Sequence, residues 1–329
     1  MPKVLLVRFS SIGDIVLTSP IIRCLKSQVE QVEIHYLTKS SFTSILEANP
    51  FVDKVFGIQK NVKEVIKELN DENYDLIVDL HNNLRSKQVI WLLNKPSKSF
   101  PKLNFKKWLL VQFKMNKMPA VHIVDRYFKA LEKLGVKNDN KGLDFNIPLE
   151  NEFQLTELPD NFRKGYLALV IGAQHYTKRM PNQKIIELCN KINYPIVLIG
   201  GKEDVKNATE IEAKVTSKIF NACGKYNLFQ SASIIKQSSV VISHDTGMMH
   251  IAASFQKKII SVWGNTVPEF GMYPYMPNHH ENNYIAEVKQ LNCRPCSKIG
   301  KKACPKTHFK CMNEIDLNDI SKHVEKFIK

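Results

Sequence analysis

The sequence predicts an α/β protein made of two doubly wound domains. Short apolar runs of strand length alternate with helical patterns in both halves, and a polar stretch containing Pro and Asn, residues 136–162, lies between the two series. Alternation of this kind favours parallel sheets covered by helices on both faces. A chain of 329 residues is long enough for two such cores. We expect domains at residues 1–155 and 156–329, with a last helix at about 316–328 that packs on the second domain or back on the first.

The individual elements follow from the same pattern. The strands expected in the first half are residues 4–7, 32–37, 52–58 and 76–80, and those in the second are 166–171, 195–201, 239–243 and 258–263. A helix is expected at 125–134, with Gly135 as its C-cap. Further helices are expected directly after Pro181, at 203–215, and in the segment that ends at Ala253.

Charge points to an anionic partner. The formal net charge is +15, which predicts binding to nucleic acid, a phosphorylated sugar or a membrane surface. Part of this charge lies between Lys95 and Lys117, where five further lysines alternate with Phe105, Trp108 and Phe113, without an acidic residue. Two interpretations stay open: a basic amphipathic helix on an anionic membrane surface, or a solvated helix packed on its own domain.

Cysteines and the beginning of the chain bear on the compartment. Met-Pro-Lys is followed directly by a strand pattern, and no run is long enough to span a bilayer, so we expect a cytoplasmic, unprocessed protein. Seven cysteines are then expected as reduced thiols. Four of them, Cys293, Cys296, Cys304 and Cys311, could hold one structural zinc, with His308 as a spare ligand. Reduced thiols or adventitious disulfides in a loop are the alternatives.

The sequence lacks the motifs of several enzyme classes. The sequence has no G-x-G-x-x-G, no G-x-x-x-x-G-K-[ST] and no G-x-S-x-G, which argues against a dehydrogenase, a P-loop nucleotidase and an α/β hydrolase. It also has no Asp-x-Asp pair that would hold a metal ion against a diphosphate, so protein groups should neutralise a bound diphosphate. A basic nucleic-acid-binding protein with a small Cys-rich zinc module remains the alternative to an enzyme.

Three strand-to-helix turns carry candidate functional residues. Asp14 follows the first strand, where it could cap a helix or act chemically. Lys178 and Arg179 precede the helix after Pro181, where cations can meet a phosphate. The turn His244-Asp245-Thr246-Gly247-Met248-Met249-His250 opens a helix whose first amides suit a phosphate oxygen.

Together these residues resemble glycosyltransferase family 9, the ADP-heptose:lipopolysaccharide heptosyltransferases. The resemblance rests, in order along the chain, on Ser10-Ser11-Ile12-Gly13-Asp14, on residues 79–86, on Gly172-Ala173 with residues 177–181, and on residues 244–250 with Trp263-Gly264-Asn265-Thr266. The chain departs from the family pattern at Met180, where Trp is common, and at residues 265–268, where a Pro-Thr-Asp-Pro-like run is common.

The resemblance implies a GT-B fold, in which two Rossmann-like domains face each other across a cleft, with the acceptor on the N-terminal side and the nucleotide sugar on the C-terminal side. It implies an inverting transfer of heptose or a related sugar from an ADP-sugar to lipopolysaccharide core or a similar anionic glycolipid, without a catalytic cofactor and without nucleic acid. The enzyme would then work in the cytoplasm, peripheral to the inner membrane surface.

Residue roles are carried over by the same resemblance. Asp14 matches the general base. The implied donor-binding residues are Lys178, Arg179, Asp245, Thr246, Gly247, Met248 and His250. The implied acceptor-binding residues are Ser11, Gly13 and Arg85.

Overall fold

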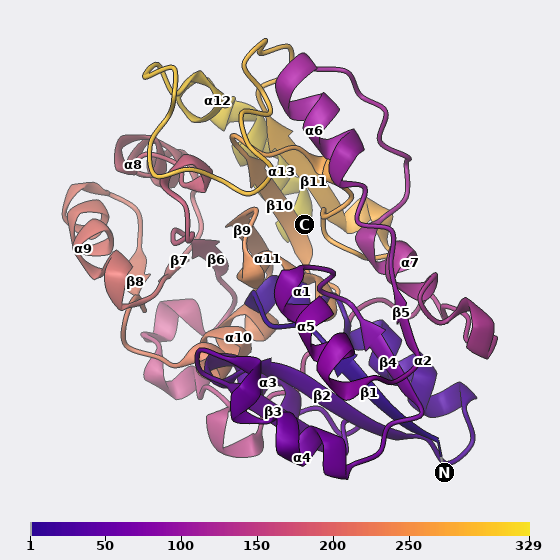
Figure 1. Cartoon of the computed structure of the whole chain (residues 1–329). Helices are drawn as coiled ribbons and strands as arrows, with labels where there is room; N and C mark the ends of the chain where they lie inside the picture. Colours follow the sequence, from indigo (N-terminus) through magenta and orange to yellow (C-terminus); the bar gives the residue numbers. More distant parts are fainter. Residues whose placement is uncertain (1) are drawn as a thin grey trace. The chain divides into compact units, whose positions relative to one another are not determined.

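The computed structural model describes residues 2–329, which divide into two compact units (Figure 1). The first unit ends at residue 146 and the second begins at Ile147, except that Asn104–Ala120 groups with the second unit. The predicted boundary at residue 155 is therefore too late. The reason is local, because the backbone N–H of Phe153 donates to Ser233 Oγ at 3.0 Å and so ties this stretch to the second unit.

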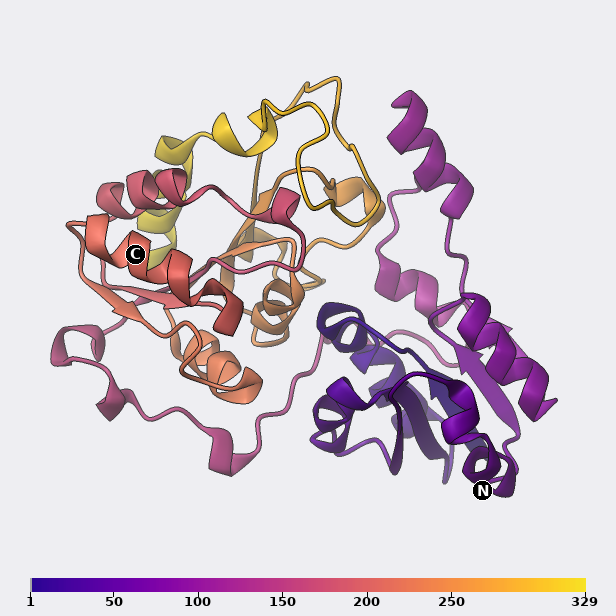
Figure 2. The same cartoon turned by 60° about the vertical axis from the view of Figure 1, so that its left-hand side comes forward.

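The first unit has a five-stranded parallel sheet of order β3-β2-β1-β4-β5. Its strands are β1 (Lys3–Val7), β2 (Glu33–Lys39), β3 (Lys54–Ile58), β4 (Leu76–Asp79) and β5 (Ser97–Ser99). Its α-helices are α1 (Ile12–Val16), α2 (Ser19–Gln28), α3 (Thr43–Glu47), α4 (Ile66–Asp71), α5 (Leu84–Leu93) and α7 (Ile123–Phe128). Contacts pair α2 with α7 and α4 with α5, on opposite faces of the sheet (Figure 2).

The second unit has a six-stranded parallel sheet of order β11-β10-β9-β6-β7-β8. Its strands are β6 (Leu167–Val170), β7 (Ile196–Ile199), β8 (Ile219–Asn221), β9 (Val240–His244), β10 (Lys258–Trp263) and β11 (Asn283–Glu287). Its α-helices are α6 (Asn104–Phe113), α8 (Asn182–Lys191), α9 (Val205–Lys214), α10 (Leu228–Gln237), α11 (Gly247–Ser254), α12 (Lys310–Asn313) and α13 (Leu317–Ile328). Helices α8, α9 and α13 pack together, and α10 packs on α11.

Both sheets reverse their strand order at one point. In the first unit β1 lies between β2 and β4, and in the second β6 lies between β7 and β9. The chain leaves the sheet to opposite faces on the two sides of such a point, so a crevice opens at the carboxyl ends of the two central strands. The ends of β1 and β4, paired at Val7 and Asp79, and of β6 and β9, paired at Val170 and Ser243, are therefore where ligands are expected.

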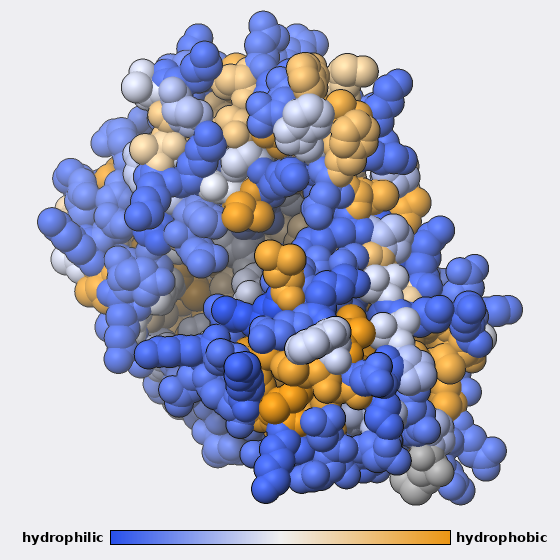
Figure 3. Space-filling model, in the orientation of Figure 1, coloured by the Kyte–Doolittle hydropathy of each residue, from blue (hydrophilic) through white to orange (hydrophobic). Residues whose placement is uncertain are grey.

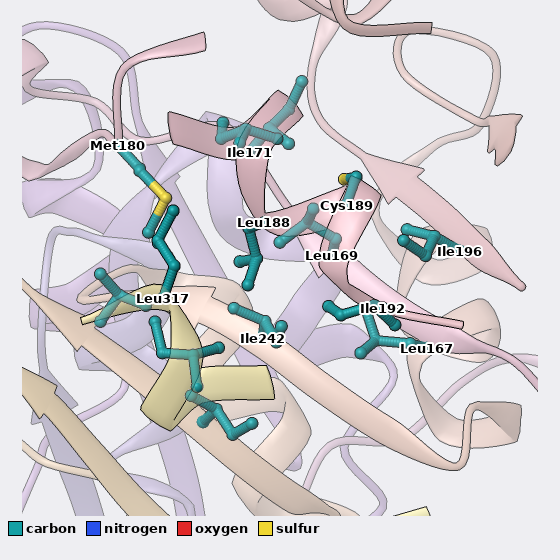
Figure 4. Packing of buried hydrophobic residues seen from close by; sticks show 14 of the residues in the cluster. Leu167, Leu169, Ile171, Met180, Leu188, Cys189, Ile192, Ile196, Ile242 and Leu317 are labelled. Carbon is teal, nitrogen blue, oxygen red and sulfur yellow. The ribbon is translucent and has the colours of Figure 1, made fainter. Parts of the chain in front are cut away.

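The core of the second unit extends from the sheet to the last helix. Leu167, Leu169, Leu188 and Ile242 are fully or almost fully buried and lie together in the view of Figure 4. Helix α13 joins this cluster through apolar side chains on one face of the helix, namely Leu317, Ile320, Val324 and Phe327. It packs on α8, β9 and β10, so the alternative that the last helix returns to the first domain is wrong.

The expected strands all form, and the sequence missed three others. These are β5, β8 and β11, each of which lies at an edge of its sheet. They contain polar residues, as in Ser97-Lys98-Ser99, because an edge strand packs fewer apolar neighbours. The helix expected at 125–134 is split into α7 and a 3₁₀ turn at Glu132–Leu134, which Gly135 ends with a φ of 70°.

Within residues 2–329, none of the helices combines the length and the apolar character that crossing a bilayer requires.

Candidate functional site

Asp14 is held by an arginine that the sequence analysis did not single out. Its Oδ1 lies 2.6 Å from Nη2 of Arg8, the residue that directly follows β1. Its Oδ2 accepts from the backbone N–H of Ser11 at 3.1 Å and from the Ser11 hydroxyl at 2.9 Å. The carboxylate therefore caps α1 and also carries a paired negative charge at the end of the strand.

Arg8 is fixed in turn by the first unit. Its guanidinium donates to the carbonyl oxygen of Leu80 at 2.6 Å, to that of Ser10 at 3.0 Å, and to the Tyr127 hydroxyl at 3.2 Å. These partners come from three parts of the chain, so the position of the guanidinium, and through it that of Asp14, depends on the folded unit. No local motif in the sequence signals this arrangement.

Electrostatics keep Asp14 ionised. Burial by itself would raise the pKa of Asp14, but the charge of Arg8 and the hydrogen bonds from Ser11 outweigh it and lower the pKa to about 2. His81, at the end of β4, has a pKa lowered to about 3, first by burial and then by the charge of Arg8. At neutral pH the site therefore holds a carboxylate beside an uncharged imidazole.

An open hollow of about 430 Å³ lies at this end of the first sheet. It is lined by Phe9, Ser10, Lys39, His81, Asn83, Leu84 and Arg85. Lys39 and Arg85 are cations, and the Arg85 guanidinium lies 5.6 Å from the centre of the Phe9 ring. Such a surface suits an anionic ligand that also has an apolar part.

Asp79 builds the loop that carries Arg85. This fully buried carboxylate accepts from the backbone N–H groups of His81 and Asn82 and from the Ser86 hydroxyl at 2.8 Å. Asn83 then caps α5 by accepting from the Ser86 N–H at 2.9 Å. Arg85 is thereby fixed in the first turn of the helix, beside the hollow.

Lys178 and Asp245, which the sequence placed in separate turns, meet in the second unit. Lys178 Nζ lies 2.6 Å from Asp245 Oδ2 and 3.1 Å from the Asp245 carbonyl oxygen. The Thr266 hydroxyl donates to the same carboxylate at 2.7 Å. An ammonium group has three protons, so these contacts leave Lys178 one donor for a ligand oxygen.

Arg179 does not share this arrangement. Its Nη1 lies 3.0 Å from Asp204 Oδ1 and its Nε donates to the Ala173 carbonyl at 2.5 Å. Asp204 also approaches Gly172 so closely that a Cβ there would lie 2.2 Å from Oδ2. Arg179 therefore anchors the turn after β6, while Lys178 is the cation beside Asp245.

The turn after β9 forms as expected. Thr246 is the N-cap of α11, with its hydroxyl 3.4 Å from that of Ser243, and Gly247 is the first helical residue. The amides of a first helical turn have no earlier carbonyl to bond, and Thr246, Gly247 and Met248 are partly exposed, so these amides suit an anion. His250 is buried, only 2 % exposed, one turn further along.

His244 begins the predicted turn but was assigned no role from the sequence, and it connects two of the turns. Its Nε2 accepts from the backbone N–H of Met180 at 2.9 Å. Burial lowers its pKa to about 4, so the ring is uncharged at neutral pH and can accept this bond. His244 therefore holds the Lys178 segment beside the turn after β9.

The Cys-rich loop braces the same turns through Arg294. The Arg294 guanidinium donates to the carbonyl oxygens of Gly264 at 2.6 Å, Thr266 at 3.0 Å and Val288 at 3.2 Å, and pairs with Glu287 at 2.6 Å. This arginine lies between two of the cysteines in sequence. The loop therefore supports Thr266, which in turn contacts Asp245.

Cys293, Cys296 and Cys304 of this loop and Cys311 of α12 are free thiols in the structure. Cys293 Sγ lies 3.8 Å from His308 Nε2, and burial raises the pKa of Cys296 and brings that of Cys311 to about 12. Across residues 2–329, the potential metal-ligand atoms of Glu33, His35 and Glu72 lie within 4.8 Å of one another, whereas the cysteines form no such group. Among the described residues, the four sulfur atoms therefore do not form an assembled tetrahedral set.

Helix α6, in the basic segment, has one packed side and one exposed side. Leu110 is buried with Val267 and Phe270 of the second unit. The aromatic side chains of Phe105, Trp108 and Phe113 are exposed; Phe105 stacks on Trp108 at 5.9 Å, and Trp108 meets Phe113 edge to face at 5.2 Å. One face thus packs on protein, on the second unit, while an aromatic cluster faces solvent.

Comparison with known proteins identifies the family. Residues 62–306 match the model of the family described as glycosyltransferase family 9 (heptosyltransferase). Lipopolysaccharide heptosyltransferase 1 of Campylobacter coli is 22% identical over 353 residues, covering 98% of each chain. The alternative of a nucleic-acid-binding protein is not supported, since the match continues through Cys304.

Solved structures have the same fold. The glycosyl transferase family 9 protein of Veillonella parvula superimposes with a TM-score of 0.76 at 20% identity, covering 99% of this chain and 97% of that one. The E. coli heptosyltransferase WaaC with ADP gives a TM-score of 0.68 at 19% identity, covering 99% of each chain. The expected GT-B fold class is confirmed. The chain belongs to glycosyltransferase family 9, the heptosyltransferases, and is a glycosyltransferase.

Proposed function

We propose that this protein transfers a heptose, with inversion, from an ADP-sugar to lipopolysaccharide core or a similar anionic glycolipid, with Asp14 as general base. The observation that carries the proposal is the pair of charged sites at the two strand-order reversals: a paired carboxylate beside a basic hollow, and an oriented lysine beside a helix N-terminus. Family relatives named as lipopolysaccharide heptosyltransferases, and a relative solved with ADP, support this choice of substrates.

In this proposal the second unit binds the donor. The remaining N–H of Lys178 and the first amides of α11, at Gly247 and Met248, bind the diphosphate oxygens. Asp245 and Thr266 keep the ammonium group in place, and Arg179 and His250 support the surrounding turns. As the bond from the anomeric carbon to the diphosphate breaks, the electron pair leaves with ADP, and these donors stabilise the charge that develops.

The first unit binds the acceptor. Arg85 and Lys39 meet its anionic groups. In this proposal Ser11, the N-cap of α1, and Gly13, in the first turn of that helix, form the wall beside the acceptor. The acceptor hydroxyl forms the new bond to the anomeric carbon while its proton passes to Asp14. A carboxylate paired with Arg8 is a weak base, so proton transfer becomes favourable only as the hydroxyl oxygen bonds to carbon and grows acidic.

We further propose that the protein acts at the inner face of the cytoplasmic membrane as a peripheral protein. The exposed aromatic cluster of α6, Phe105, Trp108 and Phe113, supports this, since aromatic side chains flanked by lysines favour the headgroup region of an anionic bilayer.

A structural metal in the Cys-rich loop also remains a proposal, separate from the chemistry. Cys293, Cys296, Cys304 and Cys311 would have to lose their protons and draw together around one ion. One structural neighbour, the heptosyltransferase TibC, is described as iron-containing (TM-score 0.58, 10% identity), so iron joins zinc as a candidate. Metal analysis of protein purified without added metal tests this proposal, and a metal content near zero contradicts it.

A donor screen tests the main proposal. Thermal unfolding is measured with ADP, with ADP-heptose, with other nucleotide sugars and with an oligonucleotide, and nucleotide release is then followed with a lipopolysaccharide core acceptor. We expect ADP and ADP-heptose to stabilise the fold and acceptor-dependent release of ADP. Stabilisation by the oligonucleotide alone, with strong salt dependence, would contradict the proposal.

A further inference from the structure

An apolar ridge runs along the exposed side of α5. Leu84 is 91% exposed and Trp91 is 77% exposed, the two most exposed large apolar side chains that the structure describes in the first unit. They are seven residues apart, two helical turns, so they lie on the same side of the helix. The opposite side is buried in the core through Val89 and Leu93. We call Leu84 and Trp91 the α5 ridge.

The charge around the ridge has one sign. Lys87 lies between Leu84 and Trp91 along the same side, with half of its side chain exposed. Residues 80–124 contain nine lysines and arginines and no acidic residue. Figure 3 shows apolar side chains gathered in the part of the first unit where α5 lies, bordered by hydrophilic ones. An apolar patch bordered by cations is complementary to an anionic interface with an apolar interior.

The ridge is continuous with the basic hollow. Leu84 belongs to both, since it also lines the hollow next to Arg85. A ligand whose anionic part occupies the hollow would therefore extend its apolar part along α5. An amphiphile in a bilayer has this construction, with charged groups at the surface and acyl chains below.

We propose that the α5 ridge inserts into the headgroup region of an anionic lipid bilayer and so presents the hollow to a glycolipid acceptor held in that bilayer. This inference rests on the proposed function and adds to it a second membrane contact, in the first unit, beside the acceptor site. Trp91 suits the role because an indole ring prefers the boundary between headgroups and acyl chains. Lys87 and Arg85 add attraction to anionic headgroups, which salt screens.

Vesicle binding of the full chain is the first test. Sedimentation with phosphatidylglycerol and phosphatidylcholine vesicles is compared for the wild type, Trp91→Ser, Leu84→Ser and Leu149→Ser. Leu149 is a matched control because it is 84% exposed but lies in the second unit, outside the basic segment. We expect Trp91→Ser and Leu84→Ser to weaken binding about tenfold each, with Leu149→Ser equal to the wild type and Trp91→Phe close to it.

Activity supplies the second readout, and Trp91 is the residue to use because it lies outside the hollow. Trp91→Ser should keep the wild-type kcat/KM with an acyl-free core oligosaccharide acceptor and lose it with the same acceptor on a lipid in vesicles. Wild-type vesicle binding by Trp91→Ser and Leu84→Ser would overturn the inference. So would a change of oligomeric state in light scattering without a change in vesicle binding, since the ridge would then be a protein interface. A wild-type protein that binds vesicles through the ridge but transfers sugar to neither acceptor would instead refute the proposed function.

Discussion

Arg8 and Asp14 form a 2.6 Å ion pair at the end of the first strand, and the pair fixes both the position and the ionisation of the proposed base. Three further contacts of Arg8, to two backbone carbonyls and a tyrosine hydroxyl, show that the arginine is part of the scaffold. Local motifs in the sequence do not reveal the pair, because Arg8 is held by Leu80 and Tyr127, which lie far away in sequence.

Removing Arg8 should destabilise the first unit. Arg8→Met leaves Asp14 partly buried without its partner and frees the Leu80 carbonyl, so we expect the free energy of unfolding to fall by about 3 kcal/mol. Urea unfolding measures the loss. The control is Lys26→Met, which breaks the more exposed pair with Asp53 and should cost less than about 1 kcal/mol. Equal effects of the two substitutions would contradict the structural role given to Arg8.

Asp14 should make stability depend on pH in the acid range. Its pKa is about 2 in the folded protein and near 3.9 in an unfolded chain, so the folded state gains stability above about pH 4 and loses it as the pH falls toward 2. The gain is about 2 kcal/mol. Asp14→Asn should therefore flatten the pH dependence of the free energy of unfolding between pH 4 and the acid limit. An unchanged slope in urea titrations at several pH values would show that the pair does not lower this pKa.

Lys178 should control donor affinity. Lys178→Met removes a cation with one donor directed away from Asp245, and charged hydrogen bonds contribute about 1.5–3 kcal/mol, so the Kd for ADP should rise at least about tenfold. Isothermal titration calorimetry measures this change. Lys184→Met is the matched control, because Lys184 pairs with Glu187 on α8 and should leave ADP binding unchanged. Wild-type affinity in Lys178→Met would remove this lysine from the proposed donor site.

Arg294 should couple the Cys-rich loop to the same site. Arg294→Lys keeps the charge but loses the forked contacts with Gly264 and Thr266, so we expect a stability loss of about 2 kcal/mol and weaker ADP binding. Differential scanning calorimetry with and without ADP measures both. Preserved stability together with preserved ADP affinity would mean that the loop does not support the donor site.

Much of the fold could be predicted from the sequence because the central strands are continuous apolar runs. Residues 4–7, 76–78, 196–199 and 240–242 lie in strands of the structure for this reason, whereas the polar edge strands β5 and β11 have no such signal. Helix α6 shows a different limit. Its amphipathic pattern was visible, but its grouping with the second unit depends on contacts with Val267 and Phe270, more than 150 residues away.

The candidate site could be predicted where its residues directly follow the carboxyl end of a strand. Asp14, Lys178 and the turn at Asp245 follow strands that flank the reversals of sheet order, so their placement followed from the doubly wound pattern. Arg8, His244 and Arg294 could not be found in this way. Each is defined by backbone carbonyls or amides from other segments, and a sequence carries no periodic signal for such contacts.

Acceptor-dependent ADP release from ADP-heptose, measured for the wild type and for Asp14→Asn, tests the central claim most directly. We predict that the wild type releases one ADP for each heptose added to a lipopolysaccharide core acceptor. Asp14→Asn should release it at least about 100-fold more slowly while binding ADP with the wild-type Kd. A wild type that releases no ADP with this donor and acceptor, or an Asp14→Asn variant that turns over at the wild-type rate, would contradict the account.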